Sequence, residues 1–207
     1  MIKLLRSILF ISVFSFGLLS TANANLEVRP GGMVYDDVLN ITWLADANYA
    51  TTSGYDSDGR MSWDEAMTWA ASLNVGGVSD WHLPTADTTC YTYNCTNSEM
   101  GHLFYNELGG TAMSSVLTSS DPDVALFTNI LGAYWSLTEW EFNPDYSWFF
   151  DFSHGYQNVS SKDYLLGFAA WAVHDGDVGL IPEPEMYAML SIGLLAMFGF
   201  GRLSRQS

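Results

Sequence analysis

Apolar positions follow two kinds of pattern along this chain. Residues 8–19 and 186–200 are nearly continuous apolar stretches, whereas the sequence between them mixes apolar and polar positions. Short continuous stretches at the ends of a chain are typical of targeting segments, and mixed patterns with a helical or strand period indicate a folded domain. We therefore expect one folded domain between two apolar ends.

The first part of the mixed region predicts a hairpin and then a helix. Residues 32–35 and 40–44 have the composition of two strands joined by a turn. Ser62 and Glu65 have the spacing of a capping box, and apolar residues recur after them at helical spacing. We expect this helix to end at the glycine pair that begins at Gly76.

The middle of the chain predicts a short strand and a second helix. Residues 80–85 have the pattern of a strand that Pro84 interrupts. Further on, four apolar residues share one helical face before a glycine pair that would stop the helix: Met100, Leu103, Phe104 and Leu108.

The last third alternates between apolar and polar residues with a period of two, which predicts strands. The expected strands cover residues 134–138, 146–152, 156–160 and 168–173. Two early helices followed by a run of strands define an α+β domain with a half-buried antiparallel sheet.

The charge of the middle region restricts its partners. Residues 25–180 hold three of the seven basic residues and 21 of the 23 acidic ones, a net charge of about −18. Binding to phosphate backbones needs clustered Lys and Arg, so nucleic acid is excluded as a partner. The high aromatic content, 15% of the chain, provides enough apolar surface for a core, so the region is not disordered.

The N-terminal segment, residues 1–24, has the three parts of an export signal. Lys3 and Arg6 precede the apolar stretch, and a small-residue site favours cleavage after Ala24. An uncleaved anchor is the alternative. We expect an exported domain over residues 25–180.

The C-terminal segment, residues 181–207, predicts a membrane helix. Its apolar run of 15 residues would reach about 23 Å, less than the roughly 30 Å hydrocarbon core, so flanking residues or local thinning must supply the rest. Arg202 and Arg205 follow the run and favour a cytoplasmic C-terminus.

Pro182, Glu183 and Pro184, the apolar run and the closing arginines together resemble the PEP-CTERM sorting signal. That resemblance implies processing by a membrane protease of the exosortase type, transient residence in the inner membrane, and release to the cell surface or medium. Glu183 would belong to the recognised tag and have no catalytic role. An unprocessed tail anchor is the alternative.

Five sequence blocks spread over the middle region resemble the DUF1566, or Lcl C-terminal, family. These blocks are residues 32–36, 41–44, 80–85, 134–136 and 170–173. The resemblance implies a C-type-lectin-like fold related to the formylglycine-generating enzymes. Where the family usually has arginine, this chain has His82 and His174, so a role that needs a permanent cation there is not expected.

Cys90 and Cys95 are the two cysteines of the chain. Export favours a disulfide between them. A redox or metal role is less favoured, because there is no second cysteine pair and no histidine at zinc-site spacing.

Residues 54–65 partly match a calcium-binding loop. Asp56, Asp58 and Glu65 occupy positions three, five and twelve of an EF-hand pattern, but Gly54 stands where the first carboxylate should be. These residues are a weak calcium site candidate, with a polar turn before a helix as the alternative. No other cofactor is expected.

The loop between two of the late strands is a candidate ligand site. Trp140 offers a flat ring beside acceptor groups, as sugar sites often do; those neighbours are Glu139, Glu141, Asn143 and Asp145. A tryptophan that simply packs in the core is the alternative.

These observations predict a non-enzymatic surface or matrix protein whose exported domain binds polysaccharide or another surface ligand. No catalytic residues are expected. The alternatives are a degenerate enzyme related to the formylglycine-generating class, which would need a reactive thiol, and a purely structural coat protein.

Overall fold

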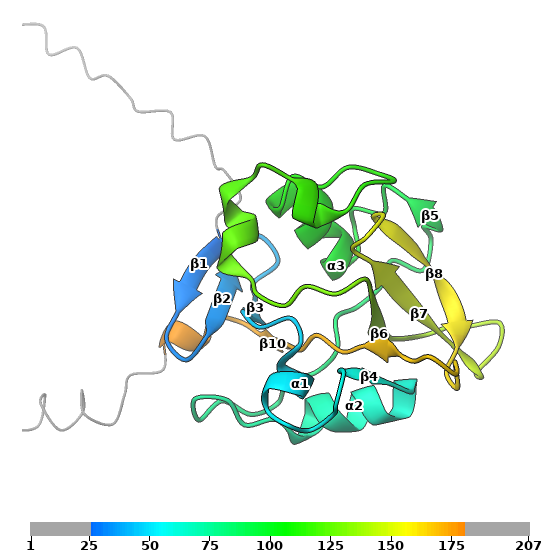
Figure 1. The fold of residues 1–207 in the computed structure, drawn as a ribbon, viewed down its shortest axis with the longest axis horizontal. Coiled ribbons are helices and arrows are strands. Elements are labelled where there is room, and N and C mark those ends of the chain that lie inside the picture. Colours follow the sequence, from blue (N-terminus) through cyan, green and yellow to red (C-terminus); the bar gives the residue numbers. More distant parts are fainter. Residues whose placement is uncertain (1–25, 181–207) are drawn as a thin grey trace, which may run out of the picture.

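The computed structural model describes residues 26–180, and the predicted signal peptide and sorting segment lie outside them. The described chain is an α+β domain with two sheets (Figure 1). The four-stranded sheet lies on the left of Figure 1 and the six-stranded sheet on the right, with α2 (Trp63–Ser72) beneath them. The α+β class is as expected, but the structure divides the strands between two sheets.

The four-stranded sheet is antiparallel and has the order β1-β2-β3-β10. Its strands are β1 (Leu26–Arg29), β2 (Met33–Asp36), β3 (Ile41–Leu44) and β10 (Val173–Asp175). The predicted hairpin is confirmed as β2 and β3, with Met33 paired to Leu44. Asp36 organises the turn, because its Oδ1 accepts the N–H groups of Val38 and Leu39.

The six-stranded sheet has the order β4-β9-β6-β7-β8-β5. Its strands are β4 (Arg60–Met61), β5 (Thr92–Tyr93), β6 (Ala133–Glu139), β7 (Tyr146–Asp151), β8 (Tyr156–Ser161) and β9 (Phe168–Ala169). After β8 the chain crosses to the other side of β6, so β9 pairs with β6 in parallel. The sheet is antiparallel as expected except at this pair, which is parallel.

The first predicted helix is confirmed as α2. Ser62 accepts the Glu65 N–H, and Glu65 Oε2 in turn accepts the Ser62 N–H at 2.9 Å. The helix ends at Ser72, earlier than the glycine pair, because the chain is extended from Leu73.

The second predicted helix has a different form. It begins as the short α3 (Glu99–His102) and continues as one π-helical segment over Leu103–Glu107. The other helices of the described chain are α1 (Tyr49–Thr52) and short 3-10 segments at Val116–Thr118, Pro122–Leu126 and Val178–Leu180. Residues 80–85 do not form the expected strand; only a single bridge joins His82 to Val173 there.

Trp171 lies at the junction of the two sheets and is fully buried. Its ring packs against Trp43 of the four-stranded sheet at 5.2 Å and Tyr134 of the six-stranded sheet at 5.4 Å. Its indole N–H donates to the Leu44 carbonyl at 2.7 Å. Edge-to-face and tilted contacts of this kind add directional packing to the burial of large apolar area, so one side chain fixes both sheets.

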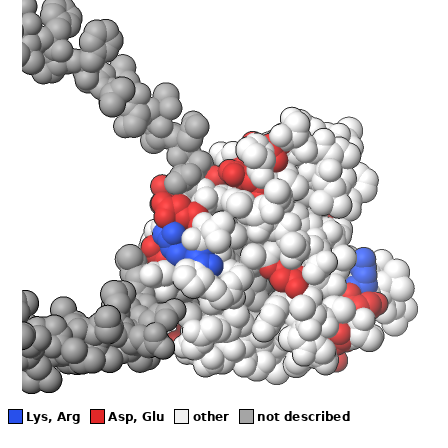
Figure 2. All heavy atoms as spheres, turned by 60° about the vertical axis from the view of Figure 1, so that its left-hand side comes forward, with Lys and Arg blue, Asp and Glu red and all other residues white. Residues whose placement is uncertain are grey.

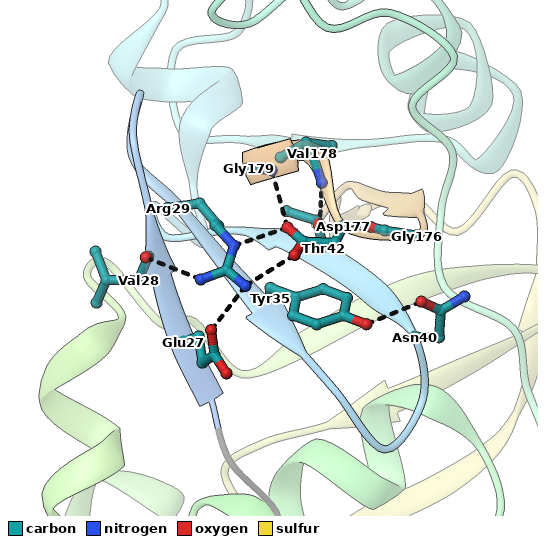
Figure 3. Close-up of polar contacts among 10 residues, drawn as sticks. All are labelled: Glu27, Val28, Arg29, Tyr35, Asn40, Thr42, Gly176, Asp177, Val178 and Gly179. Carbon is teal, nitrogen blue, oxygen red and sulfur yellow. Dashed lines mark hydrogen bonds and ion pairs between the residues drawn. The ribbon is translucent and has the colours of Figure 1, made fainter. Parts of the chain in front are cut away.

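The end of the described chain is held against its beginning. Arg29 on β1 donates from Nε and Nη2 to the two carboxylate oxygens of Asp177 at 2.7 and 2.9 Å (Figure 3). Arg29 also pairs with Glu27, and Thr42 of β3 donates to the Gly176 carbonyl. We call Arg29 and Asp177 the terminal latch.

The described chain begins and ends on the same side of the domain, at the four-stranded sheet (Figure 1). On the face shown in Figure 2, acidic side chains form separate groups between wide uncharged areas, and basic side chains occupy small areas. Over residues 26–180, no helix is both long and apolar enough to cross a membrane.

Removing the terminal latch should destabilise the domain and change its acid sensitivity. The bond from Arg29 lowers the pKa of Asp177, so the stabilisation is present above the ordinary aspartate pKa of 3.8 and disappears as the pH falls through the lower folded value. Because both groups are near the surface, we expect Asp177→Asn to cost only about 1 kcal/mol.

Urea unfolding at pH 7 and at the acidic end of the stable range measures this effect. The difference in unfolding free energy between wild type and Asp177→Asn should narrow in acid, and Asp163→Asn on the exposed loop after β8 serves as a control. An equal difference at both pH values would contradict the assigned role of the bidentate pair.

Candidate functional site

The loop predicted to bind ligand lies between β6 and β7, but its tryptophan is only partly exposed. Trp140 Nε1 donates to the Tyr91 hydroxyl at 2.8 Å, and its ring contacts Phe142 and Tyr146. Glu139 pairs with Lys162 at 3.0 Å, and the Asn143 side chain accepts the Asp145 N–H. Much of the polar capacity of this loop is therefore used within the protein, while Glu141 and Phe142 are exposed.

The residues of the calcium prediction serve the turn before α2. Asp56 Oδ1 accepts the N–H groups of Asp58 and Gly59, and Asp58 Oδ1 accepts that of Arg60. Glu65 closes the capping box. Each of the three carboxylates thus has hydrogen-bond partners within the turn and the helix cap. Calcium binding here stays a prediction.

Two of the same residues line a surface pocket of about 570 Å³. One wall is polar, with Asp58, Arg60 and Glu65, and the other is the loop between β8 and β9. That loop is strongly apolar: Leu165 is 99% exposed and Leu166 is 70% exposed. The pocket thus combines hydrogen-bonding groups with exposed apolar surface.

A row of aromatic rings continues from this pocket across the six-stranded sheet. Successive ring centroids are 5.0, 4.6, 6.2 and 5.3 Å apart. We call this the aromatic row, and its members are Tyr164, Phe168, Phe149, Tyr156 and Tyr93. Tyr164 is exposed and the other four are partly exposed.

Strand register explains why these rings align. Phe149 pairs with Asn158, and Tyr156 stands two residues before Asn158, so all three share one face of the sheet. Tyr93 pairs directly with Tyr156. The Asn158 amide donates to the Tyr156 hydroxyl, which places a polar group beside the rings. No sequence pattern indicated this row, because its members come from separate strands and the connecting loop.

The disulfide loop supports one end of the aromatic row. Cys90 and Cys95 are joined, with their Cα atoms 5.5 Å apart, and Tyr93 lies between them in the sequence. Gln157 of β8 donates from its amide to the carbonyls of Asp87 and Cys90. The loop is therefore attached to the strand that carries Tyr156.

A second polar cluster is buried away from the row. Ligand atoms of Asp36, His102 and Glu107 all lie within 4.8 Å of one another, and among the described residues this is the group with metal-ligand chemistry. His102 Nε2 and Glu107 Oε1 are 2.8 Å apart. No sequence motif indicated this cluster.

The fold and these sites define a disulfide-containing α+β domain with an aromatic sheet face. The chain belongs to the Lcl C-terminal domain family, whose model matches residues 32–174. The match confirms the family resemblance drawn from the sequence blocks and covers both sheets except β1 and the very end of β10. No curated protein and no solved structure matches the chain.

Opening the disulfide should loosen the Tyr93 end of the aromatic row. For a loop this short, the chain-entropy model gives a loss of about 2 kcal/mol in the Cys90→Ser/Cys95→Ser double variant. Urea unfolding measures this loss in the free energy of unfolding. Reduction of the wild type should cause the same loss. The double variant itself should not respond to reductant; a response would mean that reduction acts elsewhere.

Proposed function

We propose that this chain is an exported surface protein whose domain binds a polysaccharide along the aromatic row. The observation that carries the proposal is the alignment of five rings, which begins with Tyr164 at the pocket and continues across one face of the six-stranded sheet. An extended row suits an extended ligand with repeating units, because each ring offers a similar apolar surface.

Sugar rings have apolar C–H faces and polar edges, so they match a surface that combines aromatic rings with hydrogen-bonding groups. Asn158 and Asp151 share the face with Phe149. Both also bond within the protein, and their oxygens can accept a further hydrogen bond from a sugar hydroxyl. The pocket beside Tyr164 adds Asp58, Arg60 and Glu65. Together they would hold the hydroxyl groups of a chain whose faces lie on the rings.

Charge selects among polysaccharides. With about −18 charges on residues 25–180, the domain repels acidic polymers through its overall field. We therefore propose a neutral polysaccharide. The aromatic row is a better candidate than the Trp140 loop, because its rings extend over β9, β7, β8 and β5 and can contact several sugar units, whereas Trp140 lies in one loop.

An enzymatic role is the weaker alternative. An enzyme like the formylglycine-generating class would need a reactive thiol, and both cysteines of the chain are joined in a disulfide. We propose a binding function without catalysis. We also propose that the domain has the C-type-lectin-like fold that its family resemblance implies.

We also propose export through the signal peptide and sorting by an exosortase-type protease. The apolar stretches with their flanking Lys3, Arg6 and Pro182 to Pro184 support this proposal. In the domain, β5 and β8 lie on the side opposite the four-stranded sheet, where the described chain begins and ends (Figure 1). A domain held at its C-terminal end would present the aromatic row away from the membrane.

Removing rings from the row should weaken polysaccharide binding. We expect Tyr156→Ala to lower affinity for a soluble neutral β-glucan at least about tenfold, which corresponds to about 1.4 kcal/mol. Affinity electrophoresis with the glucan in the gel measures the retardation, with alginate as the acidic comparison polymer.

Tyr55→Ala is the matched control, because Tyr55 is 51% exposed and lies outside the row. Trp140→Ala tests the loop between β6 and β7. Loss of binding in Trp140→Ala with full binding in Tyr156→Ala would move the site to that loop, and no retardation of the wild type by any polymer would favour the coat-protein alternative.

Replacing Pro182, Glu183 and Pro184 by alanine should block processing. We expect wild type in its native host to lose the C-terminal segment and reach the surface or medium, while the variant stays in the membrane fraction at full length. Mass spectrometry of the mature ends measures this. Identical processing of both proteins would contradict recognition of the tag.

A further inference from the structure

The buried cluster of Asp36, His102 and Glu107 joins two parts of the fold. Asp36 ends β2 of the four-stranded sheet, while His102 ends α3 and Glu107 ends the π-helical segment. All three are shielded from solvent: Asp36 is 1% exposed, Glu107 is 3% exposed and His102 is 9% exposed.

The π-helical segment brings two of these side chains together. In a regular α-helix, residues five apart do not share a face, since the turn has 3.6 residues. A π-helical turn bonds residue i to i+5. His102 and Glu107 have this spacing, and their side chains meet at 2.8 Å. Such turns are frequent at functional sites, because they reposition side chains at a cost in helix stability.

Asp36 supplies an oxygen that has no partner. Its Oδ1 accepts two backbone N–H groups, but its Oδ2 is buried and makes no hydrogen bond. A buried carboxylate oxygen without a donor is costly, and such groups are normally satisfied. The Asp36 side chain interacts electrostatically with both His102 and Glu107, which places the carboxylate with the other two donors.

The basic group beside the two carboxylates is His102, which pairs with Glu107, while the Lys and Arg side chains of residues 26–180 have other neighbours. Arg29 is bonded to Glu27 and Asp177, and Lys162 to Glu139, while Arg60 lines the pocket near α2. Burial raises the pKa of Asp123, and the neighbouring carboxylates Asp121 and Glu107 raise it further. The surroundings of the cluster are therefore negative.

We propose that Asp36, His102 and Glu107 are ligands of a divalent transition-metal ion that links β2 to the π-helical segment. One imidazole nitrogen and two carboxylate oxygens form a mixed donor set that suits Zn²⁺ or Mn²⁺. A divalent cation neutralises the two carboxylates and gives Asp36 Oδ2 the partner that it lacks. The low exposure of all three residues assigns the ion a structural role.

The alternative is a cluster held by shared protons alone, with one carboxyl group neutral. That arrangement needs no ion and predicts no metal binding. The two possibilities therefore differ in the metal content of the protein and in its thermal stability with and without chelator.

Metal analysis of the full-length protein, purified in detergent without a histidine tag, tests the proposal. After EDTA treatment and dialysis against Zn²⁺ or Mn²⁺, we expect one ion per chain by elemental mass spectrometry and a rise of several degrees in Tm at saturating metal. Asp36→Asn and Glu107→Gln should each lower the affinity at least about tenfold.

His154→Gln is the matched control, because His154 forms a similar pair with Asp151 at 3.1 Å but is exposed. It should keep one ion per chain. The double variant Asp58→Asn/Glu65→Gln tests whether the ion sits at the turn before α2 instead. Full metal binding by Asp36→Asn or Glu107→Gln would overturn the proposal. Loss of the ion from His154→Gln or from Asp58→Asn/Glu65→Gln would overturn it as well.

A measurement on wild type covers the case in which the ligand variants fail to fold. Co²⁺ bound by one nitrogen and protein oxygens absorbs visible light differently from the aqueous ion. We expect this spectrum to appear with one equivalent of Co²⁺ and to disappear when Zn²⁺ is added. A spectrum that stays that of the aqueous ion would overturn the proposal.

Discussion

The packing around Trp171 is the contact on which the rest of the domain depends. Two sheets of different order and size must share one core, and Trp171 contacts rings from both while its indole N–H satisfies the Leu44 carbonyl. Phe127 and Phe152 complete the shell around it, at 5.3 and 5.4 Å. Buried aromatic contacts are both large and directional. This packing therefore fixes the positions of the aromatic row and of the buried cluster of Asp36, His102 and Glu107.

Local features were predictable from sequence where one short segment contains all the necessary information. The β2–β3 hairpin and the Ser62–Glu65 capping box belong to this group, because turn and cap chemistry act over a few residues. Strand periodicity likewise located β6, β7 and β8. The aromatic row needed more, since its rings meet only after β9 has crossed to the far side of β6.

Two departures have a physical cause that sequence periodicity cannot register. Apolar spacing over residues 100–108 predicted an α-helix, but the chain makes a π-helical turn there. The side chain that meets His102 is therefore five residues further on, not four. Residues 80–85 have the composition of a strand, yet Pro84 removes a donor and the segment makes only one bridge.

The terminal latch has a mechanical consequence. Tension applied to the chain after Leu180 would reach Asp177 and its bonds to Arg29 before it reached β10 or the core, since those bonds join the last described residues to β1. The load would then pass into the edge of the four-stranded sheet, far from β5 and β8. On the proposed function, force between a polymer on the aromatic row and a tether after Leu180 would thus pass through the Trp171 core.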